Sequence, residues 1–133
     1  MEKIRWTKEL SLGIRELDDQ HREIIKNLGD IVAAAQSGTN TMLLKLMKEA
    51  NSGFAAHFAA EEKIMAASPY PDTAGHEVLH GEFMEEFEDL ESRAFHGEIG
   101  EKFASEIKEN AADWFILHIK KNDIKMASYI IRK

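Results

Sequence analysis

Residues 43–64, LLKLMKEANSGFAAHFAAEEKI, decide the fold. Apolar side chains recur in this stretch every three or four residues, which is the periodicity of a helix that buries one face. The predicted buried stripe is Leu43, Met47, Ala50, Phe54, His57, Glu61 and Ile64. His57 and Glu61 are polar members of this stripe, and a polar group that is buried without a partner costs several kcal/mol. The helices that pack against this one must therefore supply partners for both side chains.

Three further stretches show the same periodicity, and each of their stripes contains histidine. The stripes are Ile14, Leu17, His21, Ile24, Leu28 and Ile31, then His76, His80, Phe83, Phe87, Leu90 and Ala94, then Phe103, Ile107, Ala111, Trp114 and His118. Turn-forming residues at 37–40, 68–72 and 96–100 separate the four stretches. Four long helices with short connections predict an all-α fold, an up-down-up-down antiparallel four-helix bundle with an N-terminal arm. We expect residues 1–133 to form a single domain.

The composition excludes several classes of protein. The 133 residues include 17 Lys and Arg against 24 Asp and Glu, and the formal net charge of −7 argues against a nucleic-acid partner. The chain has no cysteine, which excludes disulfide frameworks and thiolate metal sites. No stretch approaches the roughly 20 apolar residues of a transmembrane helix. The N-terminus also lacks the apolar segment of a secretory signal. We therefore expect no membrane association and a cytoplasmic location.

Five of the six histidines lie on the predicted buried stripes. Any one of them could be an ordinary core residue that pairs with a neighbouring carbonyl or hydroxyl group. Five separate uncompensated burials, however, would consume most of the net stability of a small domain, which is about 5–15 kcal/mol. A shared metal centre would satisfy all of them, because neutral imidazoles and carboxylates that converge on a cation replace their lost hydration with coordinate bonds.

Helical spacing tests this hypothesis. His57 and Glu61 are four residues apart, as are His76 and His80, so each pair is separated by only about 40° around a helix axis. Both members of each pair can therefore reach one centre.

The spacing of His118 and Asp123 is less favourable. Five residues of ideal α-helix separate two side chains by about 140° around the axis. A wide, π-type turn between the two residues would bring them toward one face. We predict such a turn if both side chains bind the same centre. Taken alone, Asp123 would instead be interpreted as a solvated acid beside Lys120 and Lys121.

Four motifs in this order resemble the hemerythrin family, in particular its bacterial single-domain members. They are LDDQH at 17–21, HFAAEE at 57–62, HEVLH at 76–80 and HIKKND at 118–123. Trp6 and the PYPD turn at 69–72 also match the pattern of the family. The resemblance extends from about Trp6 to Tyr129, and no ligand position departs from the pattern.

The resemblance implies a bundle that holds two non-haem iron ions joined by an oxo or hydroxo bridge. The matching residues imply that one iron is held by His76, His80 and His118, the other by His21 and His57, and that Glu61 and Asp123 bridge the two. This ligand set leaves one coordination position free on the iron with two histidines, where dioxygen is expected to bind. The implied function is reversible binding of dioxygen for transport, storage or delivery, and not catalysis.

Two other functions would use the same ligands. One is a di-iron enzyme or detoxifier that acts on peroxide or nitric oxide. Ferritin-like sites of this class use four Glu and two Glu-x-x-His motifs, whereas this chain has one such spacing, from Glu77 to His80. The other is an oxygen-sensing interaction module, whose protein partner the sequence leaves unknown. We expect no fused signalling domain, so a free-standing carrier is favoured.

Residues around the ligands can also be predicted. Apolar side chains expected to exclude water from the site are Ile24, Phe54, Phe58, Phe83, Trp114, Leu117 and Ile119. Candidates to accept the second ring N–H of a ligand histidine are Asp18, Asp19, Gln20 and Glu77, although we expect most of these four to be solvated. The sixth histidine, His96, is expected to be a solvated residue of the third turn.

Overall fold

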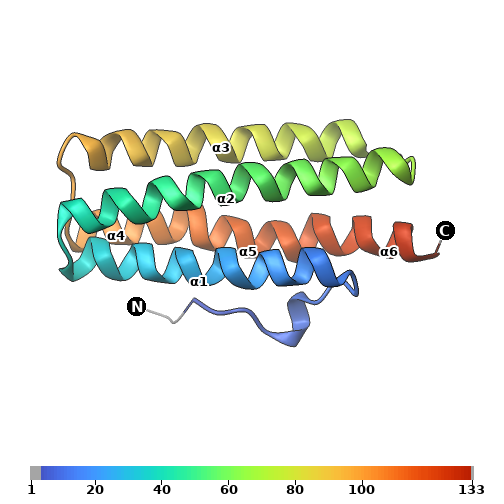
Figure 1. The fold of residues 1–133 in the computed structure, drawn as a ribbon, viewed down its shortest axis with the longest axis horizontal. Coiled ribbons are helices and arrows are strands. Elements are labelled where there is room, and N and C mark those ends of the chain that lie inside the picture. The colour runs from blue at the N-terminus through green and yellow to red at the C-terminus, as the bar shows by residue number, and fades with distance from the viewer. Residues whose placement is uncertain (1–3, 133) are drawn as a thin grey trace.

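Four antiparallel helical rods run up, down, up and down in the computed structural model, which describes residues 4–132 (Figure 1). The first three rods are α1 (Arg15–Ser37), α2 (Asn40–Ala67) and α3 (Thr73–Phe95). The fourth rod is built from the consecutive segments α4 (Glu101–Ile107), η2 (Lys108–Asp113), α5 (Trp114–His118), η3 (Ile119–Asp123) and α6 (Ile124–Arg132). The predicted bundle is thus confirmed, and within the described chain every helix is too short or too polar to cross a bilayer.

The fourth rod departs from regular α-helix at two places, because η2 and η3 are π-helical. Residues five apart lie nearly on one face of a π-turn, since its hydrogen bonds run between residues i and i+5. The turn η3 lies between His118 and Asp123, where the sequence predicts a wide turn. The sequence analysis did not predict η2.

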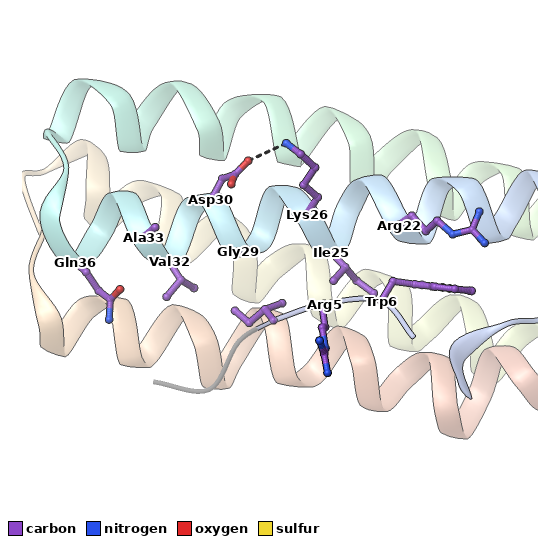
Figure 2. Close-up of a pocket in the computed structure, with 11 residues that line it drawn as sticks. Arg5, Trp6, Arg22, Ile25, Lys26, Gly29, Asp30, Val32, Ala33 and Gln36 are labelled. Carbon is purple, nitrogen blue, oxygen red and sulfur yellow. Dashed lines mark hydrogen bonds and ion pairs between the residues drawn. The ribbon is translucent and has the colours of Figure 1, made fainter. Parts of the chain in front are cut away.

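The N-terminal arm contains the short helix η1 (Lys8–Leu10) and lies along α1 (Figure 1). The guanidinium carbon of Arg22 lies 4.2 Å from the ring centroid of Trp6, and Figure 2 shows these two side chains beside each other. The arm and α1 line an open pocket of about 450 Å³, and none of the candidate metal ligands lines it. The arm therefore covers α1 without contributing to the histidine cluster.

Local interactions define the turns at one end of the bundle. The hydroxyl of Thr39 accepts a hydrogen bond from the backbone N–H of Met42 and caps α2. Gly100 has a φ of +113°, which favours glycine, and its N–H donates to the carbonyl of Ala35 at the end of α1 (2.7 Å). In the same loop His96 is exposed, as predicted, and its Nδ1 lies 2.8 Å from the Ser92 carbonyl oxygen.

The core contains a cluster of phenylalanine rings beside the buried histidines. Phe54 is the centre of this cluster, with its ring centroid 4.7 Å from that of Phe83 and 4.9 Å from that of Phe87. Phe115 is also fully buried, whereas Trp114, which was predicted for the core stripe, is only half-buried. The prediction was wrong by one residue because Trp114 and Phe115 both lie three or four residues from Ala111 and from His118, so helical spacing alone does not distinguish them.

A smaller correction concerns the end of α2. The sequence stripe ended at Ile64, but this side chain is half-buried, and Met65 is fully buried in its place. The other predicted stripe residues of α2 are all buried.

The phenylalanine cluster predicts the effect of a core truncation. Phe87→Ala should lower the free energy of unfolding by about 3–5 kcal/mol, because a fully buried ring is replaced by a cavity. Phe95→Ala is the matched control, since this ring is 73% exposed, and should change stability by about 0.5 kcal/mol or less. Urea denaturation at equal metal content measures both values, and equal losses would contradict the assigned core.

Candidate metal centre

Seven polar side chains from all four rods meet inside the bundle, and each is at most 3% exposed. They are His21 of α1, His57 and Glu61 of α2, His76 and His80 of α3, His118 of α5 and Asp123 of η3. Their donor atoms form two overlapping groups in which all atoms lie within 4.8 Å of one another. One group has three histidines and the other has two, and Glu61 and Asp123 belong to both. The predicted convergence is therefore present, while the role of these residues as ligands remains a prediction.

The carboxylate of Glu61 divides its two oxygens between the groups. Its Oε1 lies 3.0 Å from Nε2 of His76 and 3.1 Å from Nε2 of His80. Its Oε2 lies 2.9 Å from Nε2 of His57 and 3.4 Å from Nε2 of His21. A carboxylate oriented in this way can offer one oxygen to each of two neighbouring cations.

The carboxylate of Asp123 is divided in the same way. Its Oδ1 lies 3.0 Å from Nε2 of His76 and 3.1 Å from Nε2 of His118, and its Oδ2 lies 3.2 Å from Nε2 of His21. The wide turn η3 lets this side chain point to the same face as His118. Two shared carboxylates therefore separate a three-histidine position from a two-histidine position.

The donor atoms fit a metal centre better than a hydrogen-bonded core. Many of the buried nitrogen and oxygen atoms of the cluster have no hydrogen-bond partner within residues 4–132: Nδ1 and Nε2 of His21 and His118, Nε2 of His57 and His80, Oε2 of Glu61, and both carboxylate oxygens of Asp123. Several of these atoms are close to one another, but their angles do not suit hydrogen bonds. Inward imidazole nitrogens and carboxylate oxygens are typical ligands of first-row transition metals.

The carboxylates and histidines of the cluster lie close enough to shift one another's pKa values. Burial lowers the pKa of His21, but close contact with Asp123 and Glu61 outweighs this effect and raises the pKa to about 9. The same opposing causes raise the pKa of His76 to about 9. Burial raises the pKa values of the two carboxyl groups, but the surrounding histidines hold both well below their usual range. Without metal, the two carboxylates therefore favour the protonated forms of His21 and His76.

Two of the histidines have a hydrogen-bond acceptor behind the ring. Nδ1 of His57 lies 2.6 Å from Oε1 of Gln20, and Nδ1 of His80 lies 2.9 Å from Oε2 of Glu62. Since a carboxylate only accepts, Nδ1 of His80 carries the proton and Nε2 is left to face the cluster. Gln20 was among the predicted acceptors, and Glu62 was missed. One sequence feature could have revealed Glu62 as an acceptor. In the α2–α3 hairpin, Glu62 and His80 lie at similar distances from the connecting turn.

The other predicted acceptors do not contact the cluster histidines. Asp18 is buried, but it accepts hydrogen bonds from the hydroxyl of Ser11 (3.0 Å) and the backbone N–H of Leu12 (2.8 Å). It thereby joins the N-terminal arm to α1. Asp19 and Glu77 are exposed, so two of the four candidates are solvated, whereas the sequence analysis expected most of them to be.

Aromatic rings cover the histidines. The ring of Phe58 stacks on His80 with centroids 4.0 Å apart, and Trp114 stacks on His118 at 4.9 Å. Leu117 was predicted to line the site, but it is 59% exposed, because it lies on the outer side of α5. The remaining apolar residues predicted around the ligands are buried: Ile24, Phe54, Phe83 and Ile119.

Comparisons with known proteins agree with this geometry. The family model described as "Hemerythrin HHE cation binding domain" matches residues 12–130. A bacteriohemerythrin of Stenotrophomonas maltophilia (strain R551-3) is 28% identical to this chain and the match covers 94% of this chain and 80% of the relative. A myohemerythrin of Theromyzon tessulatum is 26% identical, with 93% and 91% covered.

Solved structures show the same fold. The crystal structure of wild-type hemerythrin matches with a TM-score of 0.84, covers 97% of this chain and 98% of that chain, and is 23% identical in sequence. This likeness concerns the fold, and the family is assigned by the match that spans residues 12–130. This chain, with its buried histidines and two shared carboxylates, belongs to the hemerythrin family.

Proposed function

We propose that this protein binds dioxygen reversibly at two non-haem iron ions and serves as a carrier, store or delivery protein and not as an enzyme. The observation that carries this proposal is the pair of overlapping buried donor groups that share Glu61 and Asp123. Membership of the hemerythrin family supports it. A single-domain organisation, a cytoplasmic location and the lack of a nucleic-acid partner remain predictions from the sequence.

The proposed ligand assignment follows the two donor groups. In this proposal three histidines hold one iron, two hold the other, and two carboxylates together with an oxo or hydroxo group bridge the pair. The respective residues are His76, His80 and His118, then His21 and His57, then Glu61 and Asp123. The division of each carboxylate between the groups supports the bridging role.

The side chains around the proposed centre favour binding over catalysis. Two ferrous ions, when bound, supply the electrons that dioxygen takes up on binding and returns on release. The phenylalanine rings exclude water and so prevent side reactions at the centre. The site has two buried carboxylates, whereas ferritin-like sites have four Glu. Fewer anionic ligands stabilise highly oxidised iron less, which favours binding of dioxygen over cleavage of its O–O bond.

Oxygen cycling of the iron-loaded protein tests the proposed function. We expect a visible absorption band that appears with dioxygen, fades under vacuum or argon and returns over many cycles. His118→Ala should abolish the band, because it removes a buried donor of the three-histidine group. His96→Ala should retain it, because His96 is exposed in the third turn. Steady consumption of oxygen, peroxide or nitric oxide would instead indicate an enzyme, and equal behaviour of the two variants would contradict the ligand assignment.

The pKa values of about 9 for His21 and His76 predict opposite pH trends for the metal-free and metal-loaded protein. In the metal-free protein both histidines stabilise the fold fully below their unfolded pKa of about 6.5, and this contribution is lost as the pH rises through 9. A metal ion requires neutral imidazole, so its uptake releases these protons and its apparent affinity rises over the same pH range.

Urea denaturation of the metal-free protein and cobalt competition titrations at pH 6.5, 8 and 9 measure the two trends. Calorimetry at pH 7 in buffers of different ionisation enthalpy measures the released protons. Cobalt affinity that does not change with pH, or uptake without proton release, would contradict the assigned protonation of the cluster.

A further inference from the structure

The two hydrogen-bond acceptors behind the histidines differ in charge. His80 belongs to the three-histidine group, and its Nδ1–H donates to the carboxylate of Glu62. His57 belongs to the two-histidine group, and its Nδ1–H donates to the amide oxygen of Gln20. One group is therefore supported by an anionic acceptor and the other by a neutral one.

Of the five cluster histidines, His57 and His80 are the two whose Nδ1 has a hydrogen-bond acceptor within residues 4–132. Nδ1 of His21 and Nδ1 of His118 are buried and have no hydrogen-bond partner in the part of the chain that the structure describes. Among the described residues, the rings of His21 and His118 therefore have no outer acceptor whose charge could offset the difference between Glu62 and Gln20.

We propose that Glu62 and Gln20 are positioning residues that make the two metal positions electronically unequal. Glu62 strengthens His80 as a donor and favours the higher charge state of the ion at the three-histidine position. Gln20 orients His57 without adding charge. The identification of the ions as iron rests on the proposed function, whereas the inequality itself applies to any divalent metal at these positions.

The physical basis is transfer of electron density through the imidazole ring. A hydrogen bond from Nδ1–H to an anionic acceptor is roughly twice as strong as one to a neutral acceptor. It also raises the basicity of Nε2, which faces the cluster. Removing such an outer partner typically costs about 10–100-fold in metal affinity.

The charge of Glu62 influences the centre because the ring between them is buried. The side chain of Glu62 is 38% exposed, so solvent screens its direct field, but the ring of His80 is 3% exposed and is covered by Phe58. The charge therefore acts chiefly through the hydrogen bond and the buried ring. Gln20 is half-buried like Glu62, and the ring of His57 is as buried as that of His80. The two arrangements therefore differ mainly in the charge of the acceptor.

Charge-changing variants separate this tuning from simple orientation of the rings. Glu62→Gln retains an acceptor for His80 but removes the charge, and Gln20→Glu adds a charge behind His57. Glu85→Gln is the matched control, because Glu85 is an exposed residue of α3 and its replacement changes the net charge equally. Each protein is loaded with Co²⁺, and its two dissociation constants are measured anaerobically by competition with a chelator.

Glu62→Gln should weaken binding of one of the two cobalt ions by about tenfold, the lower end of the range for loss of an outer partner, because an acceptor for His80 is retained. Gln20→Glu should lower the dissociation constant of the other cobalt ion. Glu85→Gln should leave both dissociation constants unchanged. The proposal is overturned if Glu62→Gln behaves like Glu85→Gln, or if Glu62→Gln and Gln20→Glu act on the same cobalt ion. Because cobalt binding does not involve dioxygen, failure of oxygen cycling would reject the proposed function without affecting this result.

Reduction potentials of the iron-loaded proteins provide a second readout that orientation alone would not change. A nearby negative charge stabilises the ferric state, so Glu62→Gln should raise the potential of one iron and Gln20→Glu should lower that of the other. Unchanged potentials in both variants would show that the two acceptors only orient the rings, and would overturn the proposal.

Discussion

Burial of seven ionisable side chains within one small core is the constraint on which the rest of this structure depends. Such groups lose their hydration, and hydrogen bonds among them recover only part of it, because many inward atoms have no suitably oriented partner within residues 4–132. Their donor atoms instead converge on two adjacent positions. The shared carboxylates of Glu61 and Asp123 give each position one oxygen from each acid, which is the arrangement that bridged cations require.

The fold meets this constraint by adjusting the helix that carries the least favourable spacing. In α2 and α3, pairs four residues apart share a face without distortion. In the fourth rod, His118 and Asp123 share a face because η3 is π-helical. The outer acceptors Gln20 and Glu62 connect α1 to α2 and α2 to α3, so they orient the rings and also join neighbouring rods.

The sequence predicts the four rods and the converging residues because helical periodicity and spacing carry that information directly. It also predicts a wide turn at η3 if His118 and Asp123 bind one centre, since five residues of regular helix would separate the two side chains. It does not predict η2, and it placed Trp114 in the core instead of Phe115, because both residues have helical spacing from Ala111 and His118. Glu62 was missed for another reason: its contact with His80 joins two helices, and the spacing within one helix does not reveal the register between helices.

Anomalous diffraction at the iron edge, from crystals of the iron-loaded protein, tests the central claim most directly. We expect two neighbouring peaks, one bounded by His21 and His57 and the other by the remaining three buried histidines, with Glu61 and Asp123 between them. A single peak, or peaks on the protein surface with the buried cluster empty, would contradict a pair of ions held by these seven side chains.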